Sequence, residues 1–142
     1  MRYPVLFSIV FLAFFSSCKK DKFATKPSLK FESVNTTNLS QGQSLTFNLS
    51  FTDAEGDLTD AIYITEFVPN CNKSGFDSVR YALPPFPTGK NQKGDIIVTF
   101  GYNDVPPKCF PQNDTAVFKF ILKDKAQNVS DTVVSPKIVI IN

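Results

Sequence analysis

The stretch SLTFNLSFT, residues 44–52, decides the fold, because apolar and polar side chains alternate along it without a break. The four apolar residues from Leu45 to Phe51 are separated by serine, threonine and asparagine. A period of two is typical of a β-strand that buries one face and exposes the other to water. Similar alternation recurs at residues 96–100 and 118–122. The sequence therefore predicts a protein built from β-strands.

Seven strands are expected in the segment 29–142. Turn-forming residues separate them, and no helical periodicity appears after residue 18. The expected strands are residues 29–34, 44–52, 61–68, 78–83, 95–102, 116–123 and 132–141. Seven short antiparallel strands in one domain are typical of an immunoglobulin-like β-sandwich. The tryptophan of antibody domains is missing, and a jelly roll or a small barrel is the alternative.

The N-terminus has the pattern of a secretory signal. Arg2 is followed by an apolar run from Val5 to Phe15, which is shorter than the ~20 residues of a membrane-spanning helix. Two serines then precede Cys18, and small residues before a cysteine at this place resemble a bacterial lipobox. The resemblance implies cleavage after Ser17 and attachment of lipid, such as palmitate, to the Cys18 thiol. Phe15 stands where lipoboxes usually carry leucine, and an ordinary signal peptide is the alternative.

This pattern divides the chain into three parts: a signal peptide (1–17), a lipidated cysteine with a flexible basic tether (18–28) and a sandwich domain (29–142). In bacterial lipoproteins, an aspartate directly after the lipidated cysteine favours retention in the inner membrane. This chain has Lys19 at that position, so the resemblance implies the outer membrane. The resemblance does not decide whether the domain lies on the periplasmic face or on the cell surface. Residues 19–30 hold five lysines and one aspartate, a charge of +4 that favours anionic lipid headgroups. Residues 31–142 carry nine basic and twelve acidic groups, which argues against nucleic acid as a partner.

The two remaining cysteines form a pair. Lipid on Cys18 leaves Cys71 and Cys109, and an even number of cysteines in an exported protein usually forms disulfides. If successive strand connections alternate between the two ends of the sandwich, the connections that hold Cys71 and Cys109 lie at the same end. We therefore predict a disulfide between them. The chain has no histidine, and two cysteines alone do not make a zinc site.

The opposite end of the sandwich is expected to collect three other connections. FTDAEGDL at residues 51–58 resembles the turn between the second and third strands of bacterial immunoglobulin-like and cadherin-like domains. DKAQNVS at residues 124–130 resembles their D-x-x-G-N-x-S hairpin, with Gln127 in the place of the glycine. The resemblance implies this fold and an extracytoplasmic setting, and it implies no activity.

Acidic side chains gather in these connections, and their oxygens are the ligands that calcium prefers. The candidate ligands are Asp53, Glu55, Asp57, Asp60, Asp124 and Asn128. Four lysines are expected at the same end and would offset the negative charge: Lys90, Lys93, Lys123 and Lys125. Asp-Gly turns also form for backbone reasons alone. The sequence is therefore consistent with a calcium site and equally with a turn that binds no ion.

Catalytic chemistry finds little support in the sequence. Without histidine there is no Ser–His or Cys–His pair. Asp53 with Asp57 is the one plausible carboxylate pair for glycoside hydrolysis, which also needs a cleft. Sugar binding has a few candidates: Tyr63, Tyr81 and Tyr102, and the segment 84–94 with Phe86. These aromatic residues also commonly complete a sandwich core.

We therefore expect a non-catalytic lipoprotein of the cell envelope, anchored to a membrane, that binds an envelope protein or a glycan or acts structurally. It needs no cofactor other than the calcium considered above. The first alternative is a calcium-stabilised domain of the adhesion type. A small carbohydrate-active hydrolase or a carbohydrate-binding module is the second.

Overall fold

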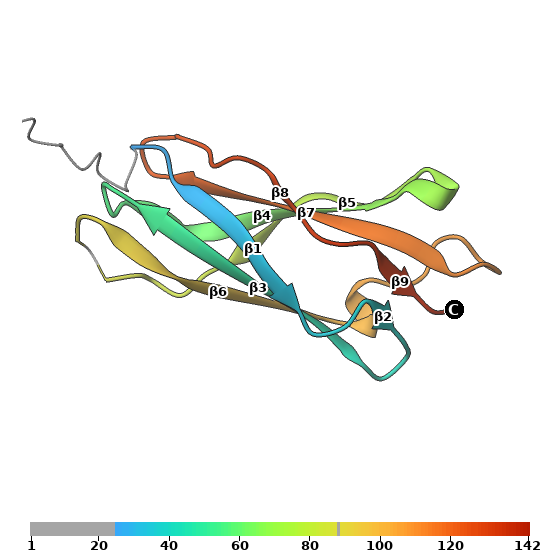
Figure 1. Cartoon of the computed structure of the whole chain (residues 1–142). Helices are drawn as coiled ribbons and strands as arrows, with labels where there is room; N and C mark the ends of the chain where they lie inside the picture. The colour runs from blue at the N-terminus through green and yellow to red at the C-terminus, as the bar shows by residue number, and fades with distance from the viewer. Residues whose placement is uncertain (1–24, 88) are drawn as a thin grey trace, which may run out of the picture.

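The computed structural model describes residues 25–87 and 89–142, with the backbone alone at residues 59, 60 and 73–77. It is an immunoglobulin-like sandwich of two β-sheets, as the sequence predicts (Figure 1). One sheet has the strand order β1 (Ser28–Val34), β3 (Ser44–Asp53) and β6 (Gln92–Gly101). The other has the order β2 (Asn38–Leu39), β9 (Ile138–Ile140), β7 (Asp114–Asp124), β4 (Leu58–Val68) and β5 (Lys73–Ala82), with β8 (Val133–Val134) beside β7.

Helical structure in these ranges is limited to two short 3-10 segments, η1 (Pro69–Cys71) and η2 (Tyr102–Asp104). No helix in the described part of the chain has the length and apolar character to cross a membrane. The lipobox and signal pattern of residues 1–18 lie outside the described residues.

The core follows from the alternation of side chains along the strands. Burial alternates along β3 and β7, so every second side chain of each strand faces the other sheet. Phe47 of β3 lies at the centre of the core. Its ring centroid is 5.0 Å from that of Phe118 and 5.1 Å from that of Phe120, both on β7. These ring contacts join the two sheets.

The predicted last strand, residues 132–141, is in fact two short strands, β8 and β9. Pro136 has no backbone N–H and therefore cannot take part in a continuous ladder. Before this break, the side chain of Ser135 supplies a hydrogen-bond acceptor to β7: its hydroxyl accepts the Phe118 N–H at 3.0 Å. A further strand lies between the first two expected strands, because β2 at residues 38–39 pairs with β9 in parallel.

Strand connections alternate between the two ends of the sandwich, as expected. The entry end, where the described chain begins, holds residues 53–57, 84–87, 89–91 and 124–131. There the Asn91 N–H donates to the Ala54 carbonyl, and the Lys125 N–H donates to the Asp57 carbonyl, both at 2.9 Å. The far end holds residues 69–72 and 102–113. Side chains that lie apart in the sequence therefore meet at each end.

Truncation of Phe47 to alanine is expected to lower the free energy of unfolding by ~3–5 kcal/mol, because a central ring is lost and a cavity remains. Phe110→Ala is the matched control, since Phe110 is 82% exposed, and it should change stability by less than ~0.5 kcal/mol. Urea unfolding measures both. Equal effects of the two substitutions would contradict the described core.

Candidate functional site

Three carboxylates meet at the entry end. Oxygen atoms of Glu55, Asp57 and Asp124 all lie within 4.8 Å of one another. The turn at Gly56 brings two of them into place, with a φ of +68° that favours glycine. A side chain there would also collide with the neighbouring loop, because an added Cβ would lie 1.8 Å from the carbonyl oxygen of Gly89. The close approach of the two loops therefore requires Gly56.

Asn128 positions Asp124 within this cluster. Its backbone N–H and its side-chain amide donate to the two carboxylate oxygens of the fully buried Asp124, each at 2.7 Å. Gln127, in the glycine position of the hairpin pattern, has a φ of +72°. The backbone thus has the left-handed conformation that glycine favours at that position, and Gln127 adopts it.

Asp53 continues the buried face of β3 beyond Phe51 and is fully buried. One of its oxygens accepts the Asp57 N–H at 3.0 Å. Its other oxygen, Oδ1, has no hydrogen-bond partner among the described residues, and Asp57 Oδ1 is buried and unpartnered as well. Two buried carboxylate oxygens without donors are unusual in a folded protein.

The structure therefore brings five of the six predicted calcium ligands together at one end. Glu55, Asp57 and Asp124 form the cluster, Asp53 adjoins it through the Asp57 N–H, and Asn128 holds Asp124. The side chain of Asp60 lies outside the described residues. Of the four lysines expected to offset the charge, Lys90, Lys93 and Lys125 are exposed and Lys123 is partly buried.

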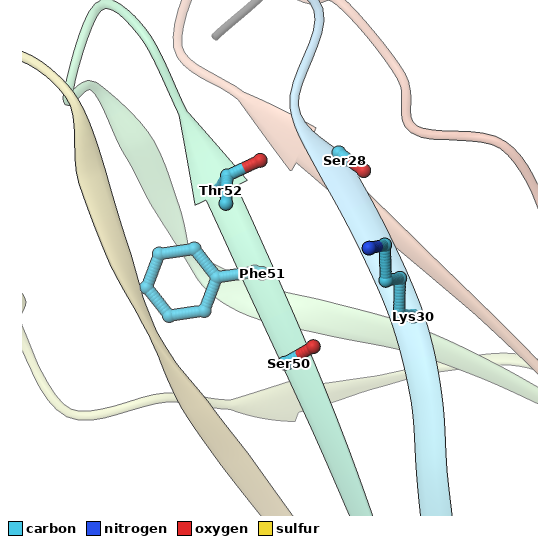
Figure 2. Close-up of a pocket in the computed structure, with 5 residues that line it drawn as sticks. All are labelled: Ser28, Lys30, Ser50, Phe51 and Thr52. Atoms are coloured by element: carbon cyan, nitrogen blue, oxygen red, sulfur yellow. The ribbon is translucent and has the colours of Figure 1, made fainter. Parts of the chain in front are cut away.

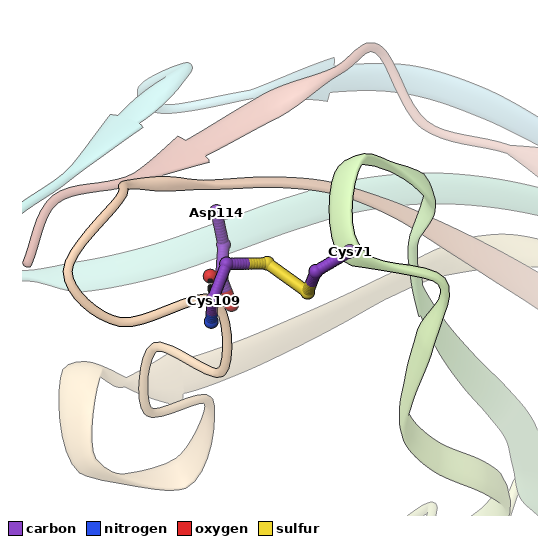
Figure 3. Close-up of side chains that lie close together, drawn as sticks. All are labelled: Cys71, Cys109 and Asp114. Carbon is purple, nitrogen blue, oxygen red and sulfur yellow. Dashed lines mark hydrogen bonds between the residues drawn. A yellow bond between two sulfur atoms is a disulfide. The ribbon is translucent and has the colours of Figure 1, made fainter.

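The far end contains the predicted disulfide, which is confirmed: Cys71 and Cys109 are bonded, with their Cα atoms 5.7 Å apart (Figure 3). Asp114 lies beside the bridge and accepts the backbone N–H groups of Lys108 and Cys109 at 2.7 and 2.8 Å. Because the two sulfurs are bonded to each other, this group of Cys71, Cys109 and Asp114 is a structural clamp and not a metal site.

A buried ion pair stands next to this clamp. Glu66 is fully buried, and its Oε2 accepts a hydrogen bond from Lys108 Nζ at 2.8 Å. Burial raises the pKa of Glu66, and the neighbouring Lys108 ammonium offsets part of that rise. This pair was not predicted from the sequence. The signal was present, because Ile62, Ile64 and Glu66 share the inward face of a strand with period two.

Two hollows lie near the entry end. The first, about 400 Å³ in volume, is lined by Ser28, Lys30, Ser50, Phe51 and Thr52 (Figure 2). The second, about 340 Å³, shares Phe51 and extends along residues 86, 87 and 89–93. Phe86 packs edge-on against Phe51, with ring centroids 4.9 Å apart, and so covers the core. Hydroxyl and ammonium groups on an open surface can bind a polar ligand, but they do not enclose a substrate.

The candidate sugar-binding tyrosines do not form an exposed platform. Tyr81 packs against Phe100 with ring centroids 6.2 Å apart. The hydroxyl of Tyr102 donates to the Ile141 carbonyl at 2.8 Å. Both rings, like that of Tyr63, are partly buried. Tyr81 and Tyr102 therefore pack against the core of the sandwich.

The raised pKa of Glu66 has a consequence for stability. Above an ordinary value of 4.5 and up to its raised pKa, the folded protein binds more protons at Glu66 than the unfolded chain. The stabilising contribution of this proton is fully present at low pH and is lost as the pH rises through the raised pKa. The stability of the wild type relative to Glu66→Gln should therefore fall over that interval.

Urea unfolding at a series of pH values measures this difference between the wild type and Glu66→Gln. Glu32→Gln, which removes an exposed carboxylate, is the control for a general change of surface charge. A difference that stays constant with pH for Glu66→Gln would contradict the assignment of the raised pKa to Glu66.

Comparison with known proteins gives likenesses of fold alone. No protein-family model matches the chain, and no curated protein matches it. The CARDB domain of a Pyrococcus furiosus protein, crystallised in complex with di-metal ions, is similar over 84% of this chain and 91% of that chain, with 8% identity and a TM-score of 0.41. A β-glucosidase from Listeria innocua is similar over 82% of this chain but only 16% of its own, with 10% identity and a TM-score of 0.43. At such low identities and scores, neither likeness transfers a function to this chain.

Proposed function

We propose that this protein is a non-catalytic module of the bacterial cell envelope, tethered to the outer membrane by lipid on Cys18. The observation that carries the proposal is the place where the chain enters the sandwich. Lys26 pairs with Asp131 at 2.6 Å, at the entry end. Lys26 is eight positions after Cys18, a distance of at most ~28 Å when the chain is extended. Lipid on Cys18 would hold the entry end toward the membrane and leave the far end facing away from it.

Burial of the acidic groups supports a non-catalytic role. Asp53, one member of the candidate carboxylate pair, is fully buried and cannot reach a substrate in solution. The two hollows near the entry end have no carboxylate among their described lining residues, whereas glycoside hydrolysis needs a pair of them. We propose that the domain binds an envelope protein or a glycan on its exposed surface, or that its role is purely structural.

Replacement of Cys18 by alanine should abolish incorporation of labelled fatty acid and move the protein from the membrane fraction to the soluble fraction, because the lipid is the anchor. The double variant Cys71→Ser/Cys109→Ser is the matched control: it loses the disulfide but keeps the lipidated thiol, so it should still incorporate label. Fractionation and fatty-acid labelling in the producing bacterium measure both. A Cys18→Ala protein that remains in the membrane would refute the anchor.

A second candidate function is calcium-dependent stabilisation of the entry end. The specific observation in its favour is the pair of buried, unpartnered oxygens, Asp53 Oδ1 and Asp57 Oδ1, next to three carboxylates within 4.8 Å of one another. Calcium takes six to eight oxygen ligands. A bound cation would compensate the clustered negative charge and supply the partner that these oxygens lack. The ligands would come from two connections and would fix them relative to each other.

Addition of millimolar calcium should raise the melting temperature by several degrees, because an ion at ~100 times its dissociation constant stabilises the folded state by ~2.7 kcal/mol. Asp57→Asn should remove the shift, and Asp95→Asn, an exposed aspartate outside the cluster, should keep it. Differential scanning calorimetry with calcium and with chelator measures this. A melting temperature that calcium leaves unchanged would exclude the site and leave the membrane anchor untouched.

A further inference from the structure

Strand β6 forms an open edge of the three-stranded sheet. It pairs with β3 over ten residues in an unbroken register, from Ser44 opposite Gly101 to Asp53 opposite Gln92. No strand pairs with its other side in the part of the chain that the structure describes. A long edge of this kind is a template for another strand.

The backbone of alternate residues in β6 points to this open side. Thr46 exchanges hydrogen bonds with Asn35 on the β1 side: its N–H donates to Asn35 Oδ1 at 2.7 Å, and its carbonyl accepts the Asn35 N–H at 3.0 Å. Its partner Thr99 on β6 therefore points its own N–H and carbonyl away from β3. Because this direction alternates along a strand, the backbone N–H and carbonyl groups of Ile97, Asp95 and Lys93 also point away from β3. None of these backbone groups has a hydrogen-bond partner among residues 25–87 and 89–142.

The open edge of the other sheet is different. Strand β5 pairs with β4 in a register that shifts on both sides of Glu66, and Ser78 has a φ of +50°. Such irregularities disfavour the addition of a strand. Strand β6 has no such break, and its outward face carries no charge between Asp95 and Gly101. Ile97 in the middle of that face is 62% exposed.

We propose that two copies of this chain pair through β6, in antiparallel fashion, about a two-fold axis at Ile97. This register places Ile97 opposite Ile97, Asp95 opposite Thr99, and Lys93 opposite Gly101. The two three-stranded sheets join into one continuous sheet. The proposal does not depend on the lipid or on calcium.

Complementarity argues for a second copy and for this register. A two-fold interface requires a surface that matches itself. With the axis at Ile97, the exposed apolar side chains cover each other and no like charges stand opposite. A shift of the axis to Asp95 would place Asp95 opposite Asp95, which is unfavourable. Asp104 accepts the Gly101 N–H at 2.6 Å, so the shared ladder ends at that residue.

The first test is the oligomeric state of residues 19–142, which contain every described strand and the whole core. Sedimentation velocity should show a dimer. Ile97→Lys should weaken dimerisation by about tenfold or more, because it places like charges directly opposite each other. Val79→Lys is the matched control: Val79 is 43% exposed on the β5 edge, and its substitution should leave the dimer intact. A wild type that stays monomeric, or a dimer that only Val79→Lys disrupts, would overturn the proposal.

The second test reads the register and does not depend on a disruptive substitution. Directly opposite, hydrogen-bonded residues have Cα atoms ~5.5 Å apart, within the range that a disulfide spans. Mild oxidation of Ile97→Cys should therefore produce a covalent dimer, whereas Val79→Cys should remain monomeric on a non-reducing gel. Equal cross-linking of the two variants would overturn the proposed pairing, as would its absence at Ile97→Cys.

Discussion

Two buried carboxylates at the ends of one strand organise the whole molecule. The alternation along β7 that places Phe118 and Phe120 in the core also places Asp114 and Asp124 at its two ends. A buried carboxylate is costly unless hydrogen bonds satisfy it. Asp114 receives two backbone N–H groups of the loop that precedes β7, and Asp124 receives two N–H donors of Asn128. One periodic strand thereby ties down a loop at each end of the sandwich.

The strands and the positions of their connections could be predicted because they depend on local patterns. Alternation located the first six expected strands, and the alternation of ends predicted the Cys71–Cys109 pair, whereas the seventh expected strand is two short ones. The pairing of β2 with β9 could not be predicted, because two residues are too few to show an alternating pattern and their partners, Val139 and Ile140, are distant in the sequence. The break at Pro136 could have been predicted, since proline interrupts a ladder wherever it falls.

For the candidate site, sequence spacing found the acidic residues but not their environments. That Glu55, Asp57 and Asp124 meet follows from loop order alone. The burial of Asp53 and its unpartnered oxygen were not predicted. They belong to a region where the loops that contain Gly56 and Gly89 approach closely, and no local sequence pattern specifies that distance. For Glu66 the reverse holds. The alternation along its strand predicts that its side chain points inward, but its partner Lys108 lies 42 residues away in an irregular segment and could not be predicted.

The direction in which β6 runs has a geometric consequence. It starts at the end where the chain enters the sandwich and finishes at the end that holds the disulfide. Antiparallel union of two such strands would turn the copies head to tail, so the entry ends of the two copies would lie at opposite poles of the joined body. With an acyl group on each Cys18, the two anchors would leave the joined body at opposite poles, either along one bilayer or between two apposed bilayers.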